Sequence, residues 1–456
     1  MFKKIKYSDQ YLAKTLFKRT LLFILFLVTL CFGFWYLNIF QALMQGQYRW
    51  WYLSPIVLSI LLTGLFGWGL YWFYKNYAPE HSDFISKYLK TVELRQMISL
   101  LIISKGFFST ANDESGTFVS YFPKVRLKVL HSSGQLVLEE PVDGQKFMQS
   151  FSKGEFDTAV EVALLADKQV SEFSKNKMAS TFAFEPIKFR YKLRDLEPRK
   201  SVVQIAKGID WKYDTFYNSL ISGNVGTGKS YTMFSIIGQL LTLTKYVEII
   251  DPKRDDLASL KYVDGLEDHV ASELDEILAM VLKYYDDMED RSKKIEKIKS
   301  TGKIGSYFDF NFAPHFLVFD EYGAFKEFGE SLNFQNENYD AYNTAMSRLN
   351  EIAMKGRSLG FYIIIGMQKP DASSLPTAIR AQLNLRINMG VPAKENKGMM
   401  FPDTDKELRP LSRNLKGWGF VQTGNTDVRS FFAPEIPKDF NLHDYIRQQI
   451  SKRKGA

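Results

Sequence analysis

The sequence predicts an α/β fold in which a large domain with a mostly parallel sheet follows two apolar helices and a small α+β region. Two long uncharged stretches occupy the first 77 residues, and an alternating apolar and polar pattern occurs near residue 130. From about residue 201 onward, short β-rich apolar runs alternate with helical patterns, which is typical of a parallel sheet flanked by helices. The 456 residues, 45% hydrophobic and 24% charged, argue against extensive disorder and suffice for a large domain and smaller parts.

Charge and cysteine content exclude some classes of protein. Lys plus Arg exceed Asp plus Glu by 59 to 51, a modest basic excess that allows contact with nucleic acid or anionic lipid without establishing either. Because Cys31 is the single cysteine, an internal disulfide is excluded. The five histidines are scattered without metal-ligand spacing, which argues against a zinc enzyme.

Residues 20–77 are expected to form two transmembrane helices. No charged residue occurs between Arg19 and Arg49, and the first part of this stretch is long enough to cross a bilayer core. A second uncharged run follows from Trp50 to Tyr74. Aromatic residues typical of membrane interfaces gather at its ends: Trp50, Trp51, Tyr52, Trp72, Tyr74 and Tyr77. The alternative for the first stretch, a cleaved signal peptide, is disfavoured by its length and by the lack of a small-residue cleavage site.

The leader, residues 1–19, predicts the orientation of these helices. It carries six basic residues against Asp9 alone, whereas the loop between the two stretches offers only Arg49. Because positive charge is retained on the cytoplasmic side, both termini are expected in the cytoplasm of a two-span protein of the cell membrane, in contact with membrane lipids.

Residues 78–200 predict a small α+β adaptor domain. A helical pattern runs from Tyr88 to Ile103, and apolar and polar residues alternate on either side of a Ser-Ser-Gly turn within 125–141, which predicts a β-hairpin. Residues 156–173 look like an amphipathic helix. A purely structural spacer is the simplest interpretation of this region.

Residues 223–230, GNVGTGKS, match the phosphate-loop pattern between a strand-like and a helix-like segment. Glycines let backbone N–H groups approach a phosphate chain at a helix N-terminus, where the helix dipole favours anions. Lys229 is expected to reach the β- and γ-phosphates of ATP, and Ser230 to ligate Mg²⁺. A glycine-rich turn without this function is the alternative. The expected nucleotide-binding residues are Gly223, Asn224, Val225, Gly226, Thr227, Gly228, Lys229, Ser230 and Tyr231.

An apolar strand that ends in two acids supplies the second half of such a site. Phe316 to Phe319 precede Asp320 and Glu321. A buried strand places its terminal carboxylate at the carboxyl edge of the sheet, beside the phosphate loop, where Asp320 can help to hold the metal. Glu321 would then polarise the attacking water. A strand that ends in two acids is common by itself, and it predicts a catalytic role here because the phosphate loop is also present.

The order of the motifs resembles the FtsK/SpoIIIE branch of the FtsK/HerA DNA-pumping ATPases. The motifs are GNVGTGKS, IIDPKRDDL at 249–257, HFLVFDE at 315–321 and IAMKGRSLGFYIIIGMQKP at 352–370. The IDPK motif is more specific than the phosphate loop, and QLNLRINMGV at 382–391 and KGWGFVQTG at 416–424 also resemble family segments. The resemblance covers about 201–435, before a basic tail at 436–456. It implies a RecA-like fold, a hexameric ring with ATP at subunit boundaries, and DNA threaded through the channel.

Two further catalytic roles are expected on this basis. Gln368 ends the strand predicted within FYIIIGMQKP, where it could sense the γ-phosphate, although it could equally form a turn. A ring ATPase needs a cation from the neighbouring subunit, an arginine finger, to stabilise the charge of the transition state. Arg357 is the preferred candidate for this finger, and Arg348, Arg380 and Arg386 lie nearby in sequence. A solvated surface role is the alternative for any one arginine.

The layout favours one function within the family. Few residues follow Ala433, so the winged-helix domain of chromosome-partitioning members has no room. The two-span, compact layout looks more like the TcpA-type coupling proteins of Gram-positive conjugative elements. The expected function is ATP-driven delivery of DNA to a conjugative type IV secretion channel, with a relaxase, the relaxosome and channel proteins as partners.

Three alternatives to this function stay open. They are a chromosome-partitioning DNA pump, a protein-export ATPase of a type VII-like system, and a non-hydrolysing scaffold. Type VII ATPases usually carry several ATPase domains, whereas this sequence shows one. The presence of Lys229, Asp320 and Glu321 argues against the scaffold.

Overall fold

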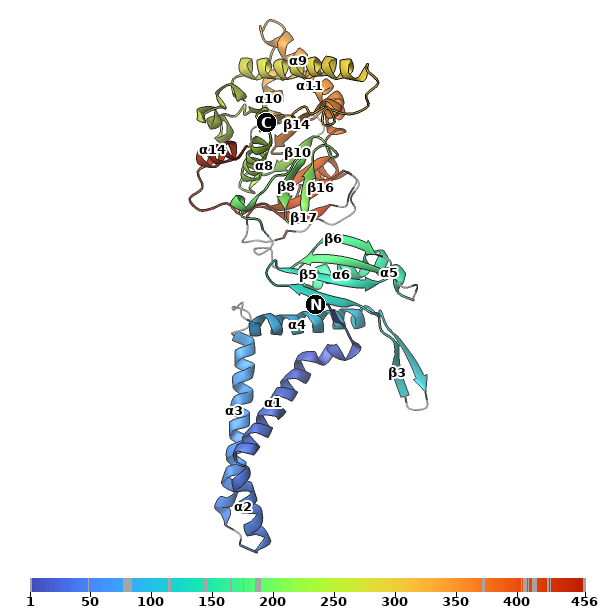
Figure 1. Ribbon diagram of the computed structural model, residues 1–456, viewed down its shortest axis with the longest axis vertical. Helices are drawn as coiled ribbons and strands as arrows, with labels where there is room; N and C mark the ends of the chain where they lie inside the picture. The colour runs from blue at the N-terminus through green and yellow to red at the C-terminus, as the bar shows by residue number, and fades with distance from the viewer. Residues whose placement is uncertain are drawn as a thin grey trace. The chain divides into compact units, whose positions relative to one another are not determined.

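The computed structural model divides into two compact units, Met1–Lys188 and Phe189–Ala456, each with its own hydrophobic core (Figure 1). The structure describes residues 2–47, 49–76, 84–113, 116–142, 144, 146–164, 166–174, 176–184, 190–370, 374–402, 404, 408, 410–411, 416–424, 426 and 428–453.

The apolar N-terminal stretches form helices α1 (Leu12–Cys31), α2 (Gly33–Met44) and α3 (Ser54–Asn76). Among the described residues, Trp50–Phe73 is the one continuous helical stretch that is long and apolar enough to cross a membrane. Tyr7–Cys31 and Gly33–Met44 meet that criterion only together, as a pair bent by 65°. The expectation of two transmembrane helices is therefore only partly supported: there is one candidate span, or two if the bent pair counts as one span.

The remainder of the first unit is built on a five-stranded antiparallel sheet in the order β1-β4-β5-β7-β6. Its strands are β1 (Lys3–Lys4), β4 (Arg126–Leu130), β5 (Gln135–Pro141), β6 (Asp167–Ser174) and β7 (Lys177–Ala183). Strands β4 and β5 form the predicted hairpin, and α4 (Phe84–Ser104) confirms the predicted helix near Tyr88. The leader joins this unit, since β1 pairs with β4 and Ile5 is fully buried.

The helix predicted over 156–173 is wrong in its second half. Helix α6 (Glu155–Leu164) ends early, and β6 then pairs with β7 along the edge of the sheet. Backbone pairing with a neighbouring strand decides this conformation, and the hydrophobic period of the segment does not reveal that neighbour. The other elements of the unit are η1 (Tyr7–Tyr11), η2 (Trp50–Leu53), α5 (Met148–Ser152) and the hairpin of β2 (Ser109–Asp113) and β3 (Gly116–Tyr121).

The second unit contains an eight-stranded sheet in the order β12-β11-β13-β14-β10-β15-β16-β17. The first six strands are parallel, β16 pairs antiparallel with β15, and β17 pairs antiparallel with β16. They are β12 (Val270–Ala271), β11 (Val247–Ile250), β13 (His315–Phe319), β14 (Phe361–Met367), β10 (Ser219–Gly223), β15 (Leu385–Met389), β16 (Trp418–Thr423) and β17 (Arg429–Phe432). This sheet confirms the predicted parallel α/β domain.

Helices flank this sheet because its central strands are apolar on both faces, as every residue of β13 and β14 is buried. Helix α11 (Tyr339–Leu359) packs along α9 (Leu274–Lys299), and α14 (Leu442–Lys452) packs on α8 (Lys229–Leu243) (Figure 1). The remaining elements are η3 (Leu193–Asp195), β8 (Val202–Ala206), β9 (Ile209–Lys212), η4 (Asp256–Tyr262), η5 (Glu267–His269), α10 (Tyr322–Glu330), α12 (Thr377–Arg380) and α13 (Lys394–Met400).

A buried arginine and histidine join α9 to the amino ends of β13 and β14. The Arg291 guanidinium donates to the carbonyl oxygens of Ala313 and Leu359 at 2.7 and 3.0 Å, and to Nε2 of His315 at 2.7 Å. The Tyr246 ring stacks on the imidazole with 4.0 Å between centroids. Burial, with the positive charge of Arg291, lowers the pKa of His315 to about 3, so the ring is neutral and its Nε2 accepts a hydrogen bond.

We expect His315 to make the stability of the second unit fall with acidification. Unfolding restores an ordinary pKa of about 6.5, so the unfolded chain binds more protons between about pH 3 and about pH 6.5. The stabilisation is complete above about pH 6.5 and is lost as the pH falls below it, by about 1 kcal/mol between about pH 7.5 and about pH 5.5. Calorimetric unfolding of the purified chain and of His315→Gln, which keeps an acceptor for Arg291, measures this. An equal loss in both proteins would contradict the prediction.

Candidate active site

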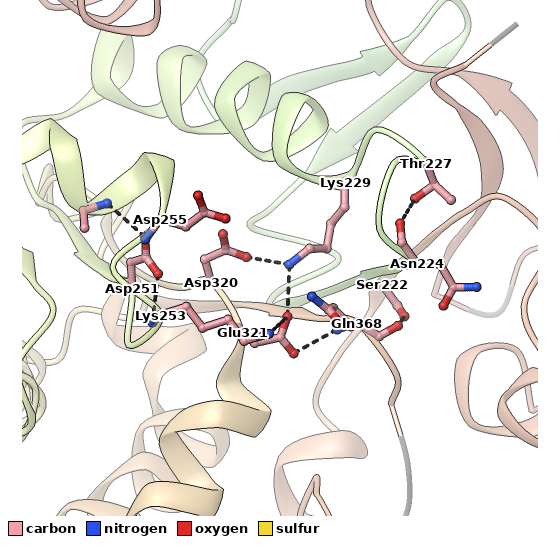
Figure 2. Close-up of polar contacts among 11 residues, drawn as sticks. Ser222, Asn224, Thr227, Lys229, Asp251, Lys253, Asp255, Asp320, Glu321 and Gln368 are labelled. Atoms are coloured by element: carbon pink, nitrogen blue, oxygen red, sulfur yellow. Dashed lines mark hydrogen bonds and ion pairs between the residues drawn. The ribbon is translucent and has the colours of Figure 1, made fainter.

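Four parallel strands bring the motif residues to one edge of the sheet (Figure 2). The phosphate loop follows β10, the acid pair follows β13, Gln368 follows β14, and the IDPK residues follow β11. Because the carboxyl ends of parallel strands lie at the same edge, residues more than a hundred positions apart in the chain become neighbours. Strand β14 lies between the strand of the phosphate loop and the strand of the acid pair.

The phosphate loop is a tight turn that leads into α8. Gly228, at the N-cap of α8, has φ 103°, which a side chain would rarely permit, and Thr227 donates to the carbonyl oxygen of Asn224 from its hydroxyl at 2.6 Å. Val225 is 86% exposed at the tip of the loop. Helix α8 begins at Lys229, so Ser230 and Tyr231 lie in its first turn, where N–H groups attract anions.

The backbone directly before the C-terminal hairpin of β16 and β17 contacts this loop. The Gly417 N–H donates to the carbonyl oxygen of Thr227 at 3.2 Å, and a Cβ built on Gly228 would lie 3.1 Å from the Cα of Gly417. Arg190 braces the same strands, since its Nε donates to the carbonyl oxygen of Ala433 at 2.8 Å. The segment 416–424, which resembles a family segment, thus contributes directly to the shape of the phosphate loop.

Lys229 is held between two buried carboxylates. Its Nζ lies 2.6 Å from Oδ1 of Asp320 and 3.6 Å from Oε2 of Glu321, and each acid is 8% exposed. The structure therefore brings together Lys229, Asp320 and Glu321. A lysine in this position can exchange a carboxylate partner for a phosphate without leaving the site.

Glu321 has an unusual backbone and a side chain held at both oxygens. Its φ of 68° and ψ of 60° are left-handed, a conformation uncommon for a residue with a side chain and often found at functional sites. Oε1 accepts from the backbone N–H of Gln368 at 3.0 Å, and Oε2 lies 3.4 Å from Nζ of Lys253. Gln368 therefore contacts the acid pair, and it does so through its backbone N–H.

Two further residues lie at this edge, Asp251 and Lys253, and the sequence motifs did not predict them as site residues. The fully buried Asp251 carboxylate accepts backbone N–H groups from Lys253, Asp255 and Ala258, at 3.2, 2.9 and 3.0 Å (Figure 2). Burial raises the pKa of Asp251, while these N–H groups lower it. The signal that could have revealed both residues is the IDPK motif itself.

The candidate arginines lie away from this cluster within the chain. Arg357 is near the end of α11, before β14 begins, and thus at the sheet edge opposite the phosphate loop; its guanidinium lies 4.9 Å from the Tyr217 ring centroid. Arg386 donates to main-chain carbonyl oxygens, Arg380 donates to Thr377, and Arg348 pairs with Glu351. Among the described residues, no contact joins any of the four to Lys229, Asp320 or Glu321.

The donor set of the site fits Mg²⁺. The described residues contain no cluster of three or more histidine, cysteine, aspartate or glutamate side chains able to hold a metal. Mg²⁺ at nucleotide sites needs no such cluster, because it takes most of its ligands from phosphates and water. The Ser230 hydroxyl and the Asp320 carboxylate are hard oxygen donors that suit this ion.

Comparison with known proteins finds a relative by sequence and similar solved structures. No family model matches. Among solved structures, the monomer form of the pCW3 conjugation coupling protein TcpA with ATPγS is 15% identical and covers 79% of this chain and 100% of that chain, with a TM-score of 0.49. The cytoplasmic domain of the type VII secretion ATPase EccC of Thermomonospora curvata is 19% identical over 56% of this chain and 32% of its own, with a TM-score of 0.40.

The relative by sequence is the FtsK domain-containing protein YdcQ of Bacillus subtilis (strain 168). It is 26% identical over 416 aligned positions, and the match covers 89% of this chain and 82% of YdcQ. The resemblance to the FtsK/HerA-type ATPases that the order of the motifs predicts is therefore confirmed by a relative with an FtsK domain that matches nearly the whole chain.

Proposed function

We propose that this protein is a membrane-anchored ATPase that moves DNA and serves as the coupling protein that delivers DNA to a conjugative type IV secretion channel. The observation that carries the ATPase assignment is the placement of Lys229 between the phosphate loop and the buried acids Asp320 and Glu321. A buried cluster of two acids and a lysine at a helix N-terminus suits an anion with a metal and a nucleophilic water beside it.

The contacts suggest how the residues divide the work of hydrolysis. Lys229 moves its ammonium from Asp320 to the β- and γ-phosphates, while the loop N–H groups hold the phosphate oxygens. Asp320 would then be free to hold Mg²⁺ together with Ser230, and the ion would supply positive charge to the phosphates of ATP. Glu321 orients the attacking water and accepts its proton. Gln368 supports Glu321 through its N–H, and its side chain is available to the γ-phosphate.

The same proposal covers the membrane anchor and the assembly of the subunits. The Trp50–Phe73 helix and the bent pair of helices cross the membrane with both termini in the cytoplasm, which suits the basic leader. The second units form a homohexameric ring with ATP at the subunit boundaries and DNA in its channel. A relaxase and its relaxosome, together with channel proteins, supply and receive the DNA.

Substitutions at Lys229 and Glu321 should have different effects. Lys229→Ala removes the main side-chain cation for the phosphates, so we expect nucleotide affinity to fall at least about tenfold. Glu321→Gln keeps the shape of the side chain but removes the carboxylate that accepts the proton. ATP should therefore stay bound while turnover falls by about 10²-fold or more. Filter binding and ATP hydrolysis by the full chain in detergent test this, with the exposed Lys299→Ala and Glu327→Gln as matched controls. Normal turnover by Glu321→Gln would refute its role as the base.

The arginine finger should act between subunits and should be Arg357. Chains with Arg357→Ala or Lys229→Ala should each be inactive, but mixed rings should regain part of the activity, because some boundaries combine both intact groups. ATP hydrolysis by co-assembled chains, with mixing verified by two affinity tags, measures the rescue. Arg348→Ala is the control, since its guanidinium pairs with Glu351 on the same helix. No rescue in verified mixed rings would count against Arg357.

The protein should bind DNA without choosing its sequence. Cations and backbone amides that line a channel contact phosphates, and such contacts carry no sequence information directly. Affinity should be similar for a transfer origin and for scrambled DNA, and it should fall log-linearly with salt as counterions are released.

Binding of the full chain to both DNAs at several salt concentrations tests this. A preference for the origin above about tenfold, about 1.4 kcal/mol, without a partner protein would mean that the chain itself reads bases. A flat salt dependence would contradict the phosphate contacts. A preference for the origin would also exclude a relaxase as the sole source of selection.

A further inference from the structure

Lys253 lies beside the acid that the proposed function makes the catalytic base. Its Nζ is 3.4 Å from Oε2 of Glu321, although the two residues belong to different motifs and follow different strands, β11 and β13 (Figure 2). The lysine side chain is 43% exposed, whereas that of Glu321 is 10% exposed. Lys253 thus enters the site from the solvent side and meets one defined oxygen of the acid.

The loop that carries Lys253 is built to hold this position. The Asp251 carboxylate accepts three backbone N–H groups of the loop, including that of Lys253 itself at 3.2 Å. Arg254, the next residue, has a left-handed φ of 56°. The backbone N–H of Asp255, which follows it, donates to the same Asp251 carboxylate. A turn organised around a buried acid is preorganised, so the lysine needs little reordering to reach Glu321.

Glu321 needs such a partner when nucleotide is bound. In the structure, Oε1 accepts from the Gln368 N–H, and Oε2 faces both Lys229 and Lys253. ATP would draw Lys229 toward its phosphates, which leaves Lys253 as the cation at Oε2. Two contacts, one at each oxygen, then fix the plane of the carboxylate in front of the γ-phosphate.

We propose that Lys253 is a positioning residue for Glu321: it holds the Oε2 end of the carboxylate in the orientation that receives the proton of the attacking water. This inference rests on the proposed ATPase function. It gives a physical reason for a lysine in the IDPK motif, with the aspartate of the motif shaping the loop and the lysine reaching across to the next strand.

The ion pair is poorly suited to a purely structural role. The lysine end of this pair is half-exposed and screened by water, and Glu321 keeps Lys229 as a second counter-charge when Lys253 is removed. Loss of Lys253 should therefore leave unfolding almost unchanged. A change in turnover without a change in stability would separate a positioning role from a structural one.

The test compares Lys253→Met, which keeps the apolar stem, with Lys253→Arg, which keeps the charge, in the full chain with DNA present. We expect the Met variant to lower kcat by about 10- to 100-fold, as a misplaced catalytic group does, with KM for ATP and the unfolding temperature almost unchanged. The Arg variant should recover a large part of kcat. Arg254→Ala is the matched control, since it removes a neighbouring charge that pairs with Glu273 instead.

A double substitution shows whether Lys253 acts through Glu321. If it does, adding Lys253→Met to Glu321→Gln should cause almost no further loss in single-turnover hydrolysis, because the base is already absent. Multiplied losses would overturn the proposal. So would a normal kcat in Lys253→Met, or a faster rate without DNA, which would mean that the lysine restrains the acid.

A failure of the proposed ATPase function can be told apart from a failure of the role proposed for Lys253. If the wild-type chain hydrolyses no ATP, or if Glu321→Gln is as active as wild type, the ATPase assignment or the base is wrong. If Glu321→Gln is inactive while Lys253→Met and Lys253→Arg both match wild type, only the role of Lys253 is wrong.

Discussion

The neutralisation of two buried carboxylates at one edge of a parallel sheet is the constraint on which the site depends. Asp320 and Glu321 are each 8% exposed, and a buried carboxylate without a counter-charge is strongly destabilising. Lys229 supplies the buried cation for both acids from the first residue of α8, whereas the half-exposed Lys253 only approaches Glu321 from the loop after β11. The strand order is what makes this possible, because it places β11, β13, β14 and β10 side by side with their carboxyl ends together.

Much of the fold could be predicted because its signals are local. Continuous apolar runs such as 315–319 and 361–367 indicate buried parallel strands, and the Ser-Ser-Gly turn indicates the hairpin of β4 and β5. The prediction over 156–173 is half wrong because strand β6 depends on pairing with β7, a tertiary contact. The bend between α1 and α2 was missed for a related reason: an uncharged stretch indicates length and apolarity, but not whether the helix is straight.

The predicted site residues also divide into those with a local sequence signal and those that depend on tertiary contacts. Lys229, Asp320 and Glu321 belong to contiguous motifs, and the structure brings them within ion-pair distance. Lys253 was missed as a site residue because its role depends on β11 lying next to β13, an order that one sequence does not reveal. Gln368 was predicted for its side chain, whereas its observed contact with Glu321 uses the main chain, which every residue shares. A partner for Arg357 from another subunit cannot be inferred from one chain.

The contact between Gly417 and the phosphate loop has a consequence for the order of synthesis. The loop is complete as a sequence once Ser230 has been added, yet the residue that supports it follows almost two hundred positions later. A ribosome adds roughly 5–20 residues each second, so the loop emerges long before its support. During that interval the nascent chain carries a phosphate-binding motif without the backbone that holds it in shape. The shape of the phosphate loop is therefore completed only late in synthesis, after Gly417 has been added.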